Sequence, residues 1–240
     1  MEIRCDLHVH SCLSPCGDGD MTPHNITGLA SILGLQLIAL SDHNTCGNCR
    51  AAMEAGKEFG LPVVPAMELT AREEAHILCF FPDADSAEAY SAYVYEKLPD
   101  IRNDPAVFGP QIRMDAMDNP TGEEPRLLIT ATDIGVYDVQ ALCRSFGGVA
   151  VPAHLNKSSY SILSALGFVD PAMHFPVCEI TASCRAELLT GEHPELAGTQ
   201  FIKDSDAHYL EQLGSAGQVL DLPEASAGAL VQYFLSFQKD

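Results

Sequence analysis

Asp6-Leu7-His8-Val9-His10 closes an apolar stretch at the start of the chain. Side chains alternate between the two faces of a β-strand, so Asp6, His8 and His10 point to the same face. Two imidazoles about 7 Å apart on one strand face can both reach one divalent ion. The stretch therefore predicts a strand that carries two candidate metal ligands. A strand with two hydrogen-bonded structural histidines is the simpler alternative.

The rest of the chain alternates apolar runs with helical patterns. Short, continuously apolar runs are typical of parallel strands that are buried on both faces. Such runs lie at 35–40, 61–67, 76–81, 126–130, 148–153, 176–181 and 200–203. Helical patterns lie at 23–33, 49–59, 87–97, 138–146, 158–166 and 224–237. This alternation indicates an α/β fold, either a barrel or an open doubly wound sheet.

The stretch 98–125 interrupts the alternation. It is rich in proline and has few long apolar runs. A stretch of this length without helical or strand patterning is usually functional or an insertion. We expect a lid or insert beside the site, within one domain that spans residues 1–240.

The charge of the chain limits its partners. It has 33 acidic and 13 basic residues, a formal net charge of −20. Such a surface repels long nucleic acids and anionic membranes, so neither is expected as a partner. A small anionic substrate can bind where metal ions reverse the local charge. The sequence has neither the apolar run of a membrane span nor the pattern of a signal peptide.

The cysteines indicate a reducing compartment. The chain has nine, an odd number at irregular spacing, which does not predict a disulfide framework. A cytoplasmic location is therefore expected. Cys46 and Cys49 form a CxxC pair without a second ligand pair nearby, so two small residues at a helix start are a simpler interpretation than a zinc or redox site.

Candidate ligands follow the expected strands. They are His43 after 35–40, Glu68 after 61–67, His154 after 148–153, and Asp204, Asp206 and His208 after 200–203. In barrels of parallel strands the site lies at this end of the strands. His76 instead opens its run, which indicates an antiparallel strand or a ligand from a loop. Imidazole with carboxylate suits zinc, manganese or iron, and the set is large enough for two or three ions.

This ordered set resembles the PHP (polymerase and histidinol phosphatase) family of metal-dependent phosphoesterases. The motifs that carry the resemblance are DLHVHS, SDHN, Glu68 with His76, AHL and SDAH, from Asp6 to His208. The resemblance implies a distorted (β/α)7 barrel with a trinuclear metal site. It is greatest to small stand-alone bacterial members that act on nucleotides or short oligonucleotides.

The resemblance also implies roles for single residues. His8, His10, Glu68 and Asp206 would hold the first ion, and a bridging Glu68 with His76 and His154 the second. His43 and His208 would hold the third, with a ligand from the next loop. Glu68, Asp206 and His208 would form the catalytic centre.

The loop after His10 departs from the family pattern. Family members usually place an Asp or His five or six residues after this histidine, where this chain has Pro15 and Cys16. A hard carboxylate suits a hydrolytic site, which favours Asp18 as the ligand. Asp20 and Cys16 are the alternatives.

Neighbouring polar residues have supporting roles. Asp6 and Asp42 are expected to accept an imidazole N–H and fix its tautomer. Asp204 is either a site residue or a solvated loop carboxylate. Lys157, Arg185 and Arg72 are candidates for binding a substrate phosphate, and each is otherwise a surface cation.

The expected reaction is hydrolysis of a phosphoester by a metal-bridging hydroxide. The substrate would be a small nucleotide, a short oligonucleotide or a sugar phosphate. One alternative is an amidohydrolase that acts on a C–N bond. The other is a non-catalytic metal-binding regulatory module.

Overall fold

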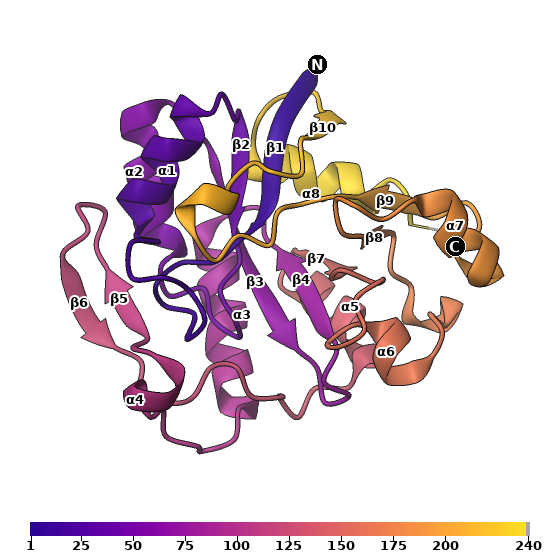
Figure 1. Ribbon diagram of the computed structural model, residues 1–240, viewed down its shortest axis with the longest axis horizontal. Helices are drawn as coiled ribbons and strands as arrows, with labels where there is room; N and C mark the ends of the chain where they lie inside the picture. The colour runs from indigo at the N-terminus through magenta and orange to yellow at the C-terminus, as the bar shows by residue number, and fades with distance from the viewer. Residues whose placement is uncertain (239–240) are drawn as a thin grey trace.

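Six strands form the central sheet, in the order β10-β1-β2-β3-β4-β7 (Figure 1). The computed structural model describes residues 1–238. The strands of this sheet are β1 (Glu2–Val9), β2 (Leu37–Leu40), β3 (Val63–Thr70), β4 (His76–Phe80), β7 (Val149–Pro152) and β10 (Gln218–Asp221). β1, β2 and β3 are parallel, whereas β10 is antiparallel to β1 and β4 is antiparallel to both of its neighbours.

The helices and two small sheets complete the fold. The helices are α1 (Pro23–Ile32), α2 (Cys49–Phe59), α3 (Ala84–Lys97), α4 (Pro105–Phe108), α5 (Val136–Ser145), α6 (Ile162–Leu166), α7 (Ala186–Glu192) and α8 (Ala227–Leu235). The small sheets are antiparallel β5 (Ile112–Met114) with β6 (Pro120–Glu123), and parallel β8 (Val177–Glu179) with β9 (Gln200–Ile202).

None of the described helices is long and apolar enough to cross a membrane.

The sheet is curled, and the β8-β9 pair lies between β7 and β1. Leu155, just after β7, donates its N–H to the carbonyl of Glu179 at the end of β8 (2.9 Å). His10, just after β1, donates to the carbonyl of Ala207, which follows β9 (2.9 Å). The expected α/β class and a barrel-like sheet are confirmed. The sevenfold repeat stays a prediction, because the described sheet contains two antiparallel strands.

Both faces of the sheet are covered. Every residue of β2, β3, β4 and β7 is buried, which explains why these strands read as continuous apolar runs. Leu37, Leu78 and Phe80 face a core that is closed by Phe234 of α8. The opposite faces of the same strands pack against α1, α2, α3 and α5.

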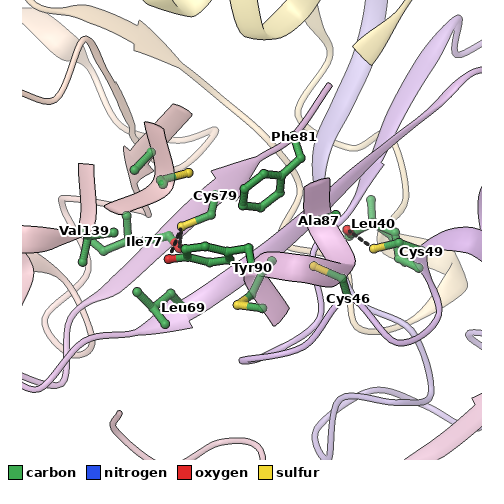
Figure 2. Packing of buried hydrophobic residues seen from close by; sticks show 14 of the residues in the cluster. Leu40, Cys46, Cys49, Leu69, Ile77, Cys79, Phe81, Ala87, Tyr90 and Val139 are labelled. Carbon is green, nitrogen blue, oxygen red and sulfur yellow. Dashed lines mark hydrogen bonds between the residues drawn. The ribbon is translucent and has the colours of Figure 1, made fainter. Parts of the chain in front are cut away.

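The CxxC pair is part of this second core. Figure 2 shows Cys46 and Cys49 among packed side chains, with Tyr90 and Phe81 nearby. The Cys46 thiol donates to the carbonyl of Ala66 (3.3 Å), and the Cys49 thiol donates to the same carbonyl (3.3 Å). Both thiols are buried where α2 begins. This placement favours the interpretation as small residues at a helix start.

Helix ends follow the sequence signals closely. Pro23 is the first residue of α1, and Gly60 ends α2 in the left-handed region (φ 64°). α3 begins earlier than expected, because the Asp83 carboxylate accepts the N–H of Ser86 and caps the helix. α6 is shorter than expected, since Ser161 caps it three residues inside the predicted range.

The expected strand at 126–130 is wrong, because residues 128–130 form a turn and a bend. The side-chain amide of Asn44 donates to the carbonyls of Leu128 (2.6 Å) and Thr130 (2.9 Å). Its oxygen accepts the N–H of Thr70 (2.8 Å). Asn44 itself has φ 52°, a conformation that asparagine tolerates better than most residues. The buried Asn44 side chain therefore forms hydrogen bonds with backbone groups that would otherwise pair with a neighbouring strand.

The stretch 98–125 contains α4 and the β5-β6 hairpin. Ile112 donates its N–H to the carbonyl of Cys12 (3.1 Å), in the loop that follows β1. Asn48 connects the same two segments, since its amide donates to the hydroxyl of Ser11 (3.0 Å) and the carbonyl of Ile112 (3.1 Å). The insert thus braces the loop after the first two histidines. Its action as a lid stays a prediction.

Replacing Asn44 by alanine is expected to lower the free energy of unfolding by about 2–4 kcal/mol, because three backbone groups lose buried partners. Urea unfolding of the metal-free protein measures the change. Asn25→Ala, at an exposed residue, is the control and should shift stability by less than about 0.5 kcal/mol. Equal effects of the two variants would contradict the assigned role.

Candidate metal centre

Glu68 stands at the centre of the site. It lies in β3, whose residues are all buried, and is 1% exposed. Five histidines place a ring nitrogen near its carboxylate: His8 Nε2 at 3.3 Å, His10 Nε2 at 3.3 Å, His43 Nδ1 at 3.1 Å, His76 Nδ1 at 2.9 Å and His154 Nε2 at 3.2 Å. They come from β1, β4 and the loops after β1, β2 and β7. His76 opens β4, which is antiparallel to β3 as one of the two expectations had it.

Asp206 supplies a second carboxylate from the loop after β9. Its Oδ1 atom lies 3.3 Å from His8 Nε2 and 3.4 Å from His10 Nε2. Its other oxygen accepts a hydrogen bond from the Lys157 ammonium. Asp206 (φ 53°) and His154 (φ 30°) both have left-handed backbone conformations, which are uncommon outside glycine and concentrate at functional sites.

Three groups of side chains bring their ligand atoms within 4.8 Å of one another. They are His8, His10, Glu68 and Asp206; His43, Glu68 and His76; and His10, His43 and His208. The first group has the composition that the resemblance implies for the first ion. In the second, His43 stands where the resemblance implies His154. In the third, His10 stands where it implies a loop ligand.

Hydrogen bonds on the far side of three rings fix which nitrogen faces the cluster. His8 Nδ1 donates to Glu179 (2.9 Å), and His10 Nδ1 donates to the Ser14 hydroxyl (3.0 Å). His208 Nδ1 donates to the carbonyl of Asp206 (2.9 Å). Each bond places a proton on Nδ1, so in the neutral ring Nε2 carries the free lone pair. These rings are therefore oriented as metal ligands are.

The three aspartates near the cluster have other partners than expected. Asp6 accepts the N–H groups of Ser205 (3.0 Å) and Gly214 (2.7 Å), not an imidazole. Asp42 accepts the Ser14 hydroxyl (2.7 Å) and so supports His10 through one intermediate residue. Asp204 is 4% exposed and accepts the N–H of Leu7 (2.7 Å), so it is not a solvated loop carboxylate.

Electrostatics favour positive charge at the centre. Burial opposes ionisation of the Glu68 carboxyl, yet the imidazoles of His76 and His8 outweigh it and hold its pKa well below its usual range. Burial likewise opposes protonation of His10, but hydrogen bonds with Asp206 and Glu68 raise its pKa to about 9. A cation at this point is therefore stabilised, whether it is a proton or a metal ion.

Two further rings of the cluster, His43 and His208, are neutral at physiological pH. Burial lowers the pKa of His43 well below its ordinary value. Burial and the neighbouring His10 lower the pKa of His208 to about 4. Neutral imidazole is the form that binds metals.

The residues present fit divalent ions. Ligands about 2.0–2.2 Å from a tetrahedral ion lie about 3.3–3.6 Å from one another. The distances of 3.3–3.4 Å that join His8 and His10 to the two carboxylates match this spacing. His43 Nδ1, His76 Nε2 and His154 Nδ1 are buried without a hydrogen-bond partner. Unpaired buried nitrogens are costly, and a metal ion would satisfy those that face it.

The loop from Ser14 to Asp20 contributes nothing to the three groups among the described residues. The Asp18 carboxylate accepts the N–H of Asp20 (2.9 Å) within the loop. The Asp18 N–H donates to the carbonyl of His208 (2.9 Å), so the main chain lies beside the cluster. Asp20 and Cys16 are exposed. A loop ligand from Asp18, Asp20 or Cys16 stays a prediction.

The structure separates the three candidate cations. Lys157 contacts Asp206 at the cluster. Arg72 instead pairs with Asp133 (2.9 Å), and both side chains are mostly exposed. Arg185 is exposed at the start of α7. Neither arginine lines the cavities beside the histidines, so of the three only Lys157 is brought to the site.

Two cavities meet at the cluster and share His154, Lys157, Asp206 and His208. The aromatic-side cavity, of about 200 Å³, also contains His76, Ile129 and Tyr160. The hydroxyl-side cavity, of about 520 Å³, also contains Thr181, Ser183 and Ser205. No residue of 98–125 lines either cavity.

Glu179 is the main site residue that the sequence analysis did not identify. It is 2% exposed and ends β8, where it accepts the Nδ1 proton of His8 and the N–H of His154 (2.6 Å). Its signal in the sequence is a single carboxylate inside the apolar run 176–181. Ser14 was also missed, because serine in a loop has no distinctive pattern.

Glu179→Gln is expected to weaken metal binding by roughly 10- to 100-fold, because it weakens the bond that orients His8. Competition with a chelator of known affinity measures the change. Glu187→Gln, at an exposed residue of α7, is the control and should bind metal as the unmodified protein does. Unchanged metal affinity in Glu179→Gln would refute this orienting role.

Curated relatives are similar over parts of the chain. A protein of Methanocaldococcus jannaschii without a characterised activity is 30% identical over 97 residues, 37% of this chain and 56% of the relative. Phosphoribosyl 1,2-cyclic phosphate 1,2-diphosphodiesterase of Eggerthella lenta is 35% identical over 78 residues, 30% of this chain and 29% of the relative. The chain thus spans 56% and 29% of these relatives. No family model matches it.

Solved structures share the whole fold. The lesion-specific endonuclease Q of Pyrococcus furiosus matches with a TM-score of 0.68 at 15% identity, over 98% of this chain and 56% of the other. A candidate metal-dependent phosphoesterase of Bifidobacterium adolescentis matches with a TM-score of 0.60 at 20% identity, over 98% and 96%. The similarities in sequence and fold support the resemblance to the PHP family of metal-dependent phosphoesterases that the ordered motifs carry.

Proposed function

We propose that the protein hydrolyses phosphoesters with the help of divalent metal ions. The observation that carries the proposal is the buried Glu68 carboxylate with five imidazole nitrogens around it. Asp206 and the Lys157 ammonium lie at the edge of the same cluster. In hydrolysis of a phosphoester, metal ligands hold the ions that activate water, and a nearby cation binds a phosphoryl oxygen. The two cavities leave room for the rest of the substrate.

The donor set supports a site for two or three ions of zinc, manganese or iron. We assign His8, His10, Glu68 and Asp206 to one ion, in line with their mutual distances. Glu68 bridges to a second ion with His76, to which His43 and His154 are the nearest further donors. His10, His43 and His208 form the candidate third set. Such ions lower the pKa of bound water and neutralise phosphoryl charge.

The protein's own groups bind and orient the substrate in this proposal. Lys157 is 40% exposed in its side chain and lies in the wall that both cavities share. Its ammonium therefore offers a phosphate oxygen a donor from either side. Asp206 holds this ammonium, and His208 is turned toward His10 by its bond to the Asp206 carbonyl. Glu68, Asp206 and His208 are the catalytic residues that we assign.

The substrate in this proposal is a small nucleotide, a short oligonucleotide or a sugar phosphate. Cavities of about 200 and 520 Å³ are of the size for small phosphorylated molecules. The net charge of −20 disfavours a long nucleic acid. A cytoplasmic location agrees with the free cysteines.

An amidohydrolase mechanism has less support. Such barrels often use a carboxylated lysine at a strand end, where Lys203 is the candidate. The Lys203 ammonium donates instead to the carbonyls of Ala182 (3.2 Å) and Cys184 (2.8 Å). Lys203 lines neither of the two cavities at the cluster.

Chelation is expected to abolish hydrolysis of phosphoesters, and added manganese or zinc should restore it, because the ions supply the nucleophile and the charge neutralisation. Release of inorganic phosphate and of p-nitrophenol from p-nitrophenyl esters measures both steps. An amide substrate is the control and should not turn over. Metal-reconstituted protein that cleaves no phosphoester would refute the proposed function.

Glu68→Gln is expected to reduce the bound metal from two or three ions to one or none, since the bridging charge is lost. Elemental analysis of the reconstituted protein measures the stoichiometry. Glu58→Gln, an exposed glutamate of α2, is the matched control. If Glu68→Gln binds as much metal as the control, Glu68 does not bridge.

A further inference from the structure

We propose that Tyr160 is a stacking platform that makes the enzyme select phosphoesters with an aromatic base close to the phosphate. The inference rests on the proposed function and narrows its substrate class to nucleotides over sugar phosphates that lack a base. It follows from the position of Tyr160, from the contrast between the two cavities and from the place of Lys157 between them.

Tyr160 presents a ring next to the metal ligands. Its ring stacks on that of His76, with centroids 4.9 Å apart and planes 20° from parallel. The residue is nevertheless 51% exposed, and it lines the aromatic-side cavity. A large aromatic side chain at a cavity wall, packed on one side and open to solvent, is the arrangement that receives a flat ligand ring.

The backbone holds this ring in place. The Tyr160 carbonyl accepts the N–H of His76 (2.9 Å), so the residue is joined to the start of β4 by its main chain as well as its ring. Tyr160 has φ 56°, an unfavourable conformation for a bulky residue. The Ser161 hydroxyl, which follows it, donates to the carbonyl of Lys157 (2.7 Å). A residue kept in a strained conformation at a cavity is a candidate for function.

Among the described residues, the hydroxyl-side cavity has no large aromatic side chain in its wall. Apart from the shared histidines, the hydroxyl-side cavity is lined by small or polar residues such as Thr181, Ser183 and Ser205. The aromatic-side cavity adds the half-buried Ile129 to Tyr160. Lys157 lies in the wall that the two cavities share. A substrate whose phosphate binds at the cluster would therefore place its aromatic base against Tyr160 and its hydroxyl groups in the hydroxyl-side cavity.

Two phosphomonoesters separate this inference from the proposed function. Adenosine 5′-monophosphate and ribose 5-phosphate share the reacting group and differ in the base. Stacking of a base on an aromatic side chain predicts a kcat/KM for the nucleotide that is roughly 10-fold or more above that for ribose 5-phosphate. Tyr160→Leu should remove most of this preference and leave ribose 5-phosphate hydrolysis within about 2-fold, because the hydroxyl and phosphate contacts remain.

Two variants control the experiment. Tyr160→Phe keeps the ring that stacks on His76, so this variant should keep the preference. Tyr137→Leu removes an exposed tyrosine that lines neither cavity and should change nothing. Metal content is measured in all variants, and saturation-transfer NMR with the nucleotide reports binding of the base without turnover.

The outcomes distinguish the two proposals. Loss of the base preference and of saturation transfer in Tyr160→Leu alone, with metal content unchanged, supports the platform. If Tyr160→Leu lowers kcat/KM equally for both substrates, or loses bound metal, Tyr160 acts only by positioning His76. Either result overturns the inference. An unmodified enzyme that hydrolyses both esters equally also overturns it while the proposed function stands. Reconstituted protein that cleaves no phosphoester contradicts the proposed function itself.

Discussion

The fold depends on one buried carboxylate. Glu68 sits inside the sheet, where an ionised carboxyl without partners would destabilise the protein by several kcal/mol. Its partners come from β1, β4 and the loops after β1, β2 and β7, so these segments must end at one place. The curled sheet meets this constraint, because it brings the ends of separate strands around a common point.

A surrounding layer of carboxylates and hydroxyls then fixes the ligands. Glu179 bonds both the ring of His8 and the main chain of His154, and so joins β1 to the loop after β7. Ser14, in the same loop as His10, accepts the proton of that ring and is itself held by Asp42 from the loop after β2. The carboxylate that orients His8 therefore comes from a distant segment, whereas Ser14 and the Asp206 carbonyl orient His10 and His208 from within their own loops.

Most of the ligand cluster was predictable from the sequence, because strand ends are visible as apolar runs followed by histidine or carboxylate. His76 at the start of its run left an antiparallel strand and a loop ligand as alternatives, and β4 is the antiparallel strand. The turn at 128–130 was not predictable, since Asn44 forms it from more than eighty positions away. The role of Glu179 depends on β8 lying beside β7, which no local pattern reveals. Roles that depend on pairing between distant segments are those that sequence patterns miss.

The hydrogen bonds of the Asp6 carboxylate determine when, during folding, the metal centre can form. This carboxylate binds the N–H groups of Ser205 and Gly214, about two hundred positions along the chain, and Ala207 bridges to Val9 beside it. His8 and His10 thus meet Asp206 only once segments about two hundred positions apart have come together. Contacts of such long range form late in folding. The first group of ligands can therefore be complete only after these distant segments have come together, which makes metal loading a late step rather than a nucleus for folding.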